Sequence, residues 1–349
     1  MTMNNTIMYS EIFESPTVLK ACEEANRGVL QALAQDIRAR GVNNIVITAR
    51  GSSDHVAFFA KYLFEIYCGL PVSFSAPSVA TIYGAKVNYQ HSFVLAVSQS
   101  GAGQDVLEVL KAAAAQGAVT AAITNTPDSP IAKACGYHLY CNAGAEKSVA
   151  ATKTFLCQLY LAAGIAAQLS GSGELAGEVA QIPRAVEYAL DFAGAIREKA
   201  GTYRFMNECF VLARGIYYPI ALEAGLKIQE TCYIRARAYA ISDFYHGPLA
   251  MADSAVPVIL IALEDRTAAD ANDMLGRLKD AGVHVLALTN QDEITHKADN
   301  AIVLDQWVTG VSGCFAAAVV AQLFACAMAV QKGNNPDAPR GLKKVTITR

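Results

Sequence analysis

The chain of 349 residues suits two domains better than one, because most domains hold roughly 100–200 residues. Hydrophobic residues make up 53% of the chain and charged residues 17%, a balance that supplies large buried cores and excludes a disordered protein. With a formal net charge of -3 and no basic run, the composition gives no electrostatic reason to expect a nucleic-acid-binding protein.

The first residues hold no charged segment followed by an apolar core, so no export signal is expected, and we predict a cytoplasmic location. The nine cysteines are scattered without a C-x-x-C pair, which indicates small core residues in a reducing compartment rather than disulfides or zinc ligands. Within the first 40 residues, Leu19, Leu30 and Leu33 follow a helical spacing. Residues 1–40 are therefore predicted to form a helical lead-in.

Several short segments recur along the chain at a shift of 164 or 165 residues. VITARGSS around Arg50 returns as FVLARGIY around Arg214, and AAITN ending at Asn125 returns as LALTN ending at Asn290. The apolar run QLYLAAGIAAQ likewise returns as QLFACAMAVQ. Ordered matches at one spacing indicate a tandem duplication.

Each copy alternates short apolar, β-branched runs with helical stretches, which predicts a parallel sheet covered on both faces. We predict two tandem α/β domains, each a doubly wound, flavodoxin-like three-layer αβα sandwich, at residues 41–171 and 199–334. A helical linker at 172–198 and a C-terminal tail at 335–349 complete the chain. The uncharged stretch at 306–331 could span a bilayer, but it matches the closing helix of the first copy, so a buried packing helix is predicted.

The first copy carries a loop suited to an anion. In FVLAVSQSGAGQD, the neutral donors Ser98, Gln99 and Ser100 lie with a glycine turn just before a helix, where backbone N–H groups bind phosphate. The second copy reads VILIALEDRTAAD at the equivalent place, and its two carboxylates should repel phosphate. We therefore expect the phosphate site in the first copy.

Two more turns of the first copy supply hydroxyl groups. ARGSSD provides Ser52 and Ser53, and KSVAATKTF provides Ser148 and Thr152 ahead of an apolar helix. Serine and threonine are also favoured as ordinary helix N-caps, so any one segment alone is ambiguous. Three such turns in one copy favour phosphate binding.

The second copy carries the reactive groups. In YPIALEAGLKIQET, Glu223, Lys227 and Glu230 share one helix face, where Glu223 and Lys227 suit an ordinary surface ion pair and Glu230 is the less ordinary member. His246 lies in a Gly-Pro turn of DFYHGPLAM, and although lone histidines are more often structural, this loop position favours a functional one. No spacing resembles a metal site, and no cofactor is expected.

The motifs ARGSSD, SQSG, KSVAATKTF, ALEAGLKIQET, YHGPLA and PRGLKK occur together in this chain. With them the chain resembles, over nearly its whole length, the double sugar-isomerase-domain family. That family includes the isomerase half of glucosamine-6-phosphate synthase and stand-alone glucosamine-6-phosphate deaminases. The variants ARGSSD and SVAATKTF look closer to the deaminases.

The resemblance implies a role for each matching residue. Glu230 matches the glutamate that moves a proton between C1 and C2 of the sugar, and His246 matches a ring-opening histidine that serves the neighbouring subunit's site, which implies a homodimer. Lys344 matches a tail lysine that closes over the site and can form an imine with a ketose phosphate. The positions that match binders of the sugar phosphate and its open-chain hydroxyls are Ser52, Ser53, Ser98, Gln99, Ser100 and Thr152.

Ala151 stands where the synthases have Ser, and Gly103 where they have Thr, so the identity of the sugar phosphate is left open. The 349 residues include no glutaminase segment, and no ammonia from glutamine is expected. We therefore expect conversion of glucosamine 6-phosphate to fructose 6-phosphate and ammonia. One alternative is a deglycase that splits a fructosamine-type 6-phosphate. The other is a non-catalytic sugar-phosphate sensor, which the presence of the catalytic groups disfavours.

Overall fold

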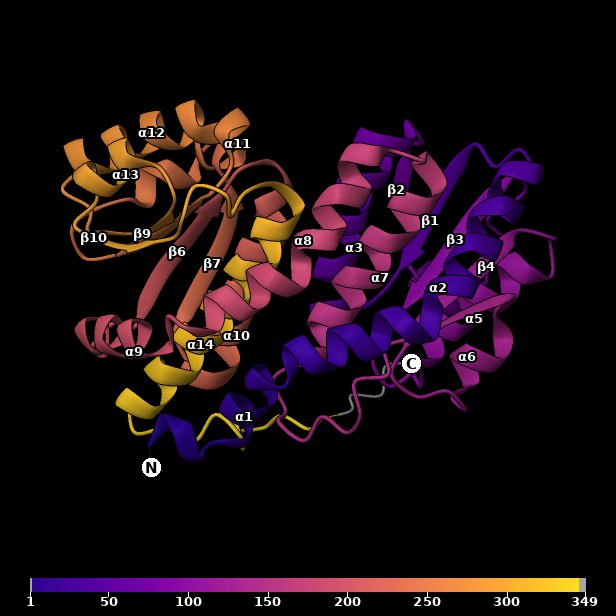
Figure 1. Cartoon of the computed structure of the whole chain (residues 1–349), viewed down its shortest axis with the longest axis horizontal. Helices are drawn as coiled ribbons and strands as arrows, with labels where there is room; N and C mark the ends of the chain where they lie inside the picture. Colours follow the sequence, from indigo (N-terminus) through magenta and orange to yellow (C-terminus); the bar gives the residue numbers. More distant parts are fainter. Residues whose placement is uncertain (1, 345–349) are drawn as a thin grey trace. The chain divides into compact units, whose positions relative to one another are not determined.

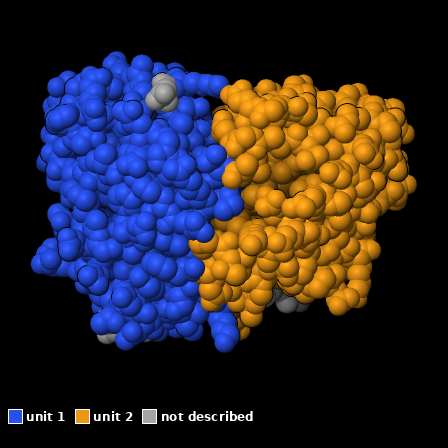
Figure 2. Space-filling view, viewed as in Figure 1, with its two compact units in different colours: residues 1–13, 147–150, 181–342 blue, residues 14–146, 151–180, 343–349 orange. Residues whose placement is uncertain are grey.

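The computed structural model describes residues 2–344 of the chain (Figure 1). Contacts divide it into two compact units, coloured separately in Figure 2. Unit 1 comprises residues 1–13, 147–150 and 181–342, and unit 2 comprises residues 14–146, 151–180 and the tail from residue 343. The domain boundaries expected from the sequence stay predictions, and each unit is described by itself.

Unit 2 holds a five-stranded parallel sheet in the order β2-β1-β3-β4-β5. Every residue of β3 and β4 is buried, as expected for strands covered on both faces. Helices α2, α3 and α7 pack together, while α5 and α6 pack on β3 and β4 around Val94, Ala122 and Ile131. The strands are β1 (Asn44–Thr48), β2 (Val72–Phe74), β3 (Ser92–Val97), β4 (Val119–Thr124) and β5 (Tyr137–Tyr140). The helices are α2 (Ser15–Ala39), α3 (Ser52–Leu63), η2 (Phe64–Cys68), α4 (Ser78–Thr81), α5 (Gln104–Ala114), α6 (Pro130–Ala134) and α7 (Lys153–Ser170).

Unit 1 repeats this topology in the order β7-β6-β8-β9-β10, again all parallel. Two tandem doubly wound α/β folds are thereby confirmed. The strands are β6 (Glu208–Ala213), β7 (Arg235–Ala240), β8 (Val258–Ala262), β9 (Val285–Thr289) and β10 (Asn300–Val303). The helices are η1 (Met3–Asn5), α1 (Ile7–Phe13), α9 (Ala193–Thr202), η3 (Gly215–Tyr217), α10 (Tyr218–Cys232), α11 (Ile241–Phe244), η4 (Pro248–Met251), α12 (Asp265–Asp280), α13 (Asp292–Lys297) and α14 (Gly310–Gln331), with α8 (Gly173–Leu190) between the two sheets in sequence.

The duplication extends to individual contacts. In unit 2, Arg50 Nη2 lies 2.9 Å from Asp105 Oδ2, and in unit 1, Arg214 Nε lies 3.1 Å from Asp270 Oδ2. The glycine after each arginine has a positive φ, 58° in the first copy and 61° in the second. In each copy the arginine follows the first strand and the aspartate lies on the helix after the third strand. The same ion pair therefore joins these two segments in both copies.

Helix α14 is the uncharged stretch flagged in the sequence, and among the described residues it is the one helix long and apolar enough to cross a membrane. Most of its residues are buried inside the fold, where it packs on α9 and α10, so it is a core helix as predicted. Just before it, Trp307 lies under the Arg184 guanidinium, 4.3 Å from the ring centroid, and against the Tyr188 ring. All nine cysteines are free thiols, and seven are buried.

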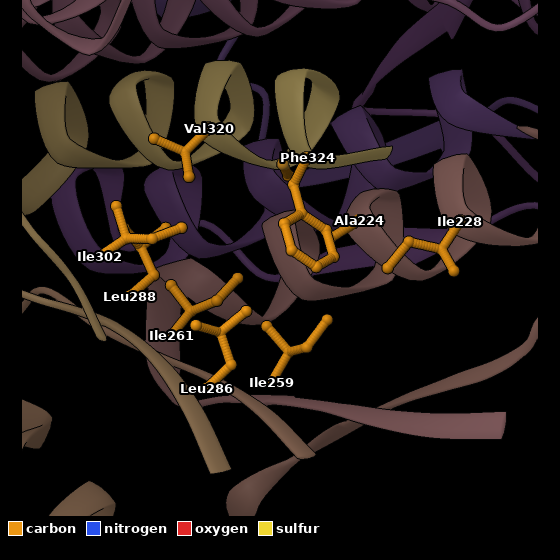
Figure 3. A pocket seen from close by; sticks show the side chains of 10 residues that line it. Ala224, Ile228, Ile259, Ile261, Leu286, Leu288, Ile302, Val320 and Phe324 are labelled. Atoms are coloured by element: carbon orange, nitrogen blue, oxygen red, sulfur yellow. The ribbon is translucent and has the colours of Figure 1, made fainter. Parts of the chain in front are cut away.

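Unit 1 contains an apolar cavity of about 30 Å³ between α10, α14 and strands β8–β10 (Figure 3). Isoleucine and leucine side chains from the strands face Val320 and Phe324 of α14 across it. Ligand pockets usually measure roughly 300–1,000 Å³ and place a few polar groups in their walls. This cavity has neither property, so it is a packing gap in the core and not a sugar-phosphate site.

Candidate functional site

The sheet of unit 2 reverses its winding direction between β1 and β3. In doubly wound sheets, ligands bind at the carboxyl ends of the strands where this reversal occurs. Ser52 and Ser53 begin α3, with three residues between them and the end of β1, and the segment 98–100 directly follows β3. The fold therefore brings two of the three predicted donor segments to neighbouring strand ends.

Gly101 shapes the loop after β3. Its φ is 62°, and a Cβ added there would lie 2.0 Å from Ser129 Oγ and 2.4 Å from Ser129 Cβ. Its N–H donates to Ser98 Oγ at 3.2 Å, and its carbonyl accepts from the Ile131 N–H at 3.1 Å. Because only glycine fits this conformation and this space, the loop has one tightly defined path.

The rest of the loop is held by hydrogen bonds of its backbone, and its side chains remain partly accessible to solvent. The Asn125 N–H donates to the Gln99 carbonyl at 2.9 Å, and the Ala102 N–H donates to Ser100 Oγ at 3.3 Å. The side chains of Ser98, Gln99 and Ser100 are half-buried, and α5 begins a few residues later. A rigid, neutral, partly open loop that leads into a helix N-terminus is suited to an anion.

The carboxylate in the first turn of α5 is balanced by a cation. Asp105 is buried, and its Oδ2 accepts from both Nε and Nη2 of Arg50, each at 2.9 Å. The loop thus keeps its suitability for phosphate despite a carboxylate next to it. In the second copy, the equivalent segment places Glu264 between β8 and α12, directly before the first residue of α12.

Ser52 and Ser53 point to different surroundings. Ser52 is half-buried at the start of α3. Ser53 is only 6% exposed, and its hydroxyl donates to Gln158 Oε1 of α7 at 3.1 Å. The hydroxyl of Ser53 therefore faces the protein interior, which leaves Ser52 as the more accessible of the two predicted binding residues.

Thr152 lies in a cluster around a glutamate that sequence reasoning missed. Glu146 Oε1 accepts from the Thr152 N–H at 2.9 Å, the Thr152 hydroxyl at 3.1 Å and the Thr154 N–H at 3.0 Å. Its Oε2 accepts from the Thr154 hydroxyl at 2.7 Å and pairs with Lys344 of the tail. Burial raises the pKa of Glu146, but Lys344 and these hydrogen bonds outweigh it and hold that pKa below its usual value.

The only signal for Glu146 in the sequence is its place six residues before a Thr-Lys-Thr helix start. The Glu146 carboxylate accepts hydrogen bonds from backbone N–H groups at the N-terminus of α7. The sequence predicted a bound anion at this position. Thr152 itself is fully buried, so its hydroxyl lies beneath Glu146 and does not open onto solvent.

The helix α10 carries the predicted catalytic glutamate within a buried ionic group. Lys227 Nζ lies 3.2 Å from Glu223 Oε1 and 2.6 Å from Glu230 Oε2. The expectation of an ordinary surface pair for Glu223 and Lys227 is wrong, because their side chains are 2% and 1% exposed, whereas Glu230 is 20% exposed. Burial lowers the pKa of Lys227, but the two glutamates outweigh it and raise that pKa above its usual value, so the lysine is an ammonium.

His246 lies in an exposed turn between α11 and η4. The preceding residue, Tyr245, is held by two contacts of α12. Its Oη donates to Asp273 Oδ2 at 2.7 Å, and Arg277 lies over its ring. Within the described part of unit 1, no hydrogen bond or ion pair joins His246 to Glu230. The structure therefore leaves the His246 side chain at the surface of its unit.

Curated relatives match almost the whole chain. It is 34% identical over 359 residues to the glutamine–fructose-6-phosphate aminotransferase [isomerizing] of Xylella fastidiosa (strain Temecula1), an alignment that covers 97% of this chain and 59% of that protein. The Thermococcus kodakarensis protein of the same name is 31% identical and is covered over 58% of its length. The chain thus spans less than two thirds of the length of these relatives.

Solved structures show the same fold. The C-terminal domain of glucosamine-fructose-6-phosphate aminotransferase from Francisella tularensis superposes with a TM-score of 0.84 at 26% identity, covering 96% of this chain and 98% of that one. The glucosamine-6-phosphate deaminase from Thermotoga maritima gives 0.77 at 21% identity, with 98% and 100% coverage, which shows likeness of fold alone. The SIS domain model matches residues 40–166 and again 206–332. On these matches and on its two sheets, the chain belongs to the SIS domain family, with two copies in tandem.

Proposed function

We propose that this protein is a phosphosugar isomerase that acts as a deaminase, converting glucosamine 6-phosphate and water to fructose 6-phosphate and ammonia. The observation that carries the proposal is Glu230, the accessible end of a buried ionic group on α10. The relatives' names, which join fructose 6-phosphate to an isomerizing aminotransferase, support the same substrate class.

The central step is a proton transfer in the open-chain sugar. The Glu230 carboxylate removes the proton from C2 of the amino aldehyde and returns one to C1, while another proton passes from the nitrogen to O1. The product is the imine of the ketose, with its C=N bond at C2. Water then adds to C2, and ammonia leaves. Lys227 balances the charge of Glu230 inside the protein, since its ammonium lies 2.6 Å from the carboxylate.

The remaining predicted residues are assigned to substrate binding, to ring opening and to the ketose form of the sugar. The loop of Ser98, Gln99 and Ser100 at the N-terminus of α5 takes the phosphate, and its neutral donors and defined path support this assignment. His246 opens the ring, for which the family's arrangement requires a homodimer, and Lys344 acts on the ketose form. Of the three residues predicted to bind the sugar hydroxyls, Ser52 keeps that assignment, because the hydroxyls of Ser53 and Thr152 face the protein interior.

The test is ammonia release from purified protein given glucosamine 6-phosphate. Loss of the base in Glu230→Gln should lower turnover by about 10²-fold or more. Glu293→Gln, on the exposed ion pair with Lys297 in the same unit, removes the same charge and should leave turnover unchanged. If Glu230→Gln turned over like the wild type, the proposed mechanism would be wrong.

A fructosamine 6-phosphate adduct serves as the parallel substrate. Amine release from the adduct alone would replace the deaminase with a deglycase. Tight binding of either compound without turnover would favour a sugar-phosphate sensor.

A further inference from the structure

One lysine of the C-terminal tail forms an ion pair with a buried carboxylate. Leu342 and Lys343 are exposed, but Lys344 turns inward and pairs with Glu146, and its side chain is only 23% exposed. The Glu146 side chain has no exposed surface at all. A fully buried carboxylate needs partners to offset its lost hydration, so this contact differs from a surface ion pair.

Glu146 joins the tail to the predicted substrate-binding segment. One of its oxygens accepts from the N–H groups of Thr152 and Thr154, and the other receives Lys344. The first turn of α7 thereby holds the glutamate through contacts that do not involve the tail. Lys344 is in turn fixed next to Thr152, because both bind one carboxylate.

We propose that Glu146 is the positioning residue of Lys344, holding its amine beside Thr152 at the place from which it attacks a bound ketose phosphate. This inference rests on the proposed function, because it assigns the tail lysine an imine step. In that step Lys344 loses one proton to water, and its nitrogen attacks the C2 carbonyl carbon. The C=O bond breaks, water leaves and a C=N bond forms.

A neighbouring ion pair provides a matched control. Lys153, also in the first turn of α7, pairs with Glu14 Oε2 at 2.6 Å. Here the lysine is buried, with 3% of its side chain exposed, and the carboxylate is half exposed. Glu14→Gln removes one charge at the same helix end without touching the Glu146–Lys344 pair.

The first measurement is limited acetylation of lysines, read by fragment masses of the tail peptide. Glu146→Gln changes one oxygen to an NH2 group, so the remaining oxygen still accepts from α7 while the amide no longer attracts an ammonium. We expect the ratio of Lys344 to Lys343 acetylation to rise several-fold in Glu146→Gln and to stay at the wild-type value in Glu14→Gln. An unchanged ratio in a folded Glu146→Gln protein would overturn the proposal.

The second measurement is reductive trapping of the imine by cyanoborohydride with fructose 6-phosphate. Glu146→Gln should lower the maximal trapping rate roughly tenfold, since the amine loses its orientation, while the half-saturating concentration stays constant because the phosphate loop is intact. Trapping at the wild-type rate with a freely acetylated Lys344 would overturn the proposal. No trapping in the wild type would instead count against the proposed function, and the acetylation ratio would still decide whether Glu146 holds the tail.

Discussion

Lys227 shows how much one buried residue can depend on its neighbours. Its ammonium is enclosed in unit 1 and faces Glu223 on one side and Glu230 on the other. The i, i+4 spacing that brings it to Glu223 is the spacing of countless exposed pairs. Sequence alone therefore predicts the pairing, but burial depends on β7 and α14 covering α10, which is a tertiary property.

Lys227→Met keeps the length of the side chain and removes the charge. We expect a loss of about 3–5 kcal/mol of stability, because the buried Glu223 and the partly buried Glu230 both lose the ammonium that balances them. Urea denaturation measures the loss. Lys297→Met, on an exposed pair with Glu293, should cost less than about 1 kcal/mol, and a similar cost at both positions would contradict the account.

At the scale of elements, the turn between β3 and α5 depends on a single glycine. Gly101 combines a positive φ with contact to Ser129, whose Oγ accepts from the Ala132 N–H and caps α6. A side chain at this position would push on a residue that is itself needed to start a helix. The loop and α6 are therefore coupled by packing.

Gly101→Ala should destabilise the protein by about 2–4 kcal/mol and weaken fructose 6-phosphate binding, because backbone strain and a steric clash act together. Gly117→Ala is the matched control, since Gly117 also has a positive φ, 77°, but meets nothing within 4 Å of an added Cβ. That variant should lose about 1 kcal/mol and keep its binding. Thermal melting and titration calorimetry measure the two effects, and equal losses would remove the role assigned to Ser129.

At the scale of the whole molecule, the two copies can be compared, because the same contact occurs in each. Both make the arginine–aspartate pair, but the Asp105 side chain is 3% exposed and the Asp270 side chain is 54% exposed. A hydrogen bond to a buried charge stabilises far more than a solvated one. The same contact is thus expected to have different energetic weight in the two halves.

Asp105→Asn should cost about 2–3 kcal/mol, since it leaves Arg50 without its carboxylate in a partly buried setting. Asp270→Asn should cost less than about 1 kcal/mol. Chemical denaturation of the two variants gives the comparison. Equal costs would show that burial of the aspartate does not govern the strength of the pair.

The sequence predicted the sheets because apolar runs such as those of β3 and β8 alternate with helices at one spacing in both copies. It also predicted that Ser98, Gln99 and Ser100 lie between an apolar strand and a helix. It missed Glu146, since nothing in a linear sequence shows that a carboxylate reaches forward to cap a later helix. It could not foresee that the hydroxyls of Ser53 and Thr152 point inward, because side-chain direction depends on the packing of α7.

Trp307 provides a fluorescence signal from one of the two duplicated units. It is the one tryptophan in the sequence, and its ring is held by Arg184 and Tyr188 within unit 1. Its emission therefore follows the melting of that half alone, whereas far-ultraviolet circular dichroism sums the helices of both. If the two melting curves coincide, the duplicated halves have become one cooperative unit, and if they separate, each half still unfolds as the independent domain from which the chain was built.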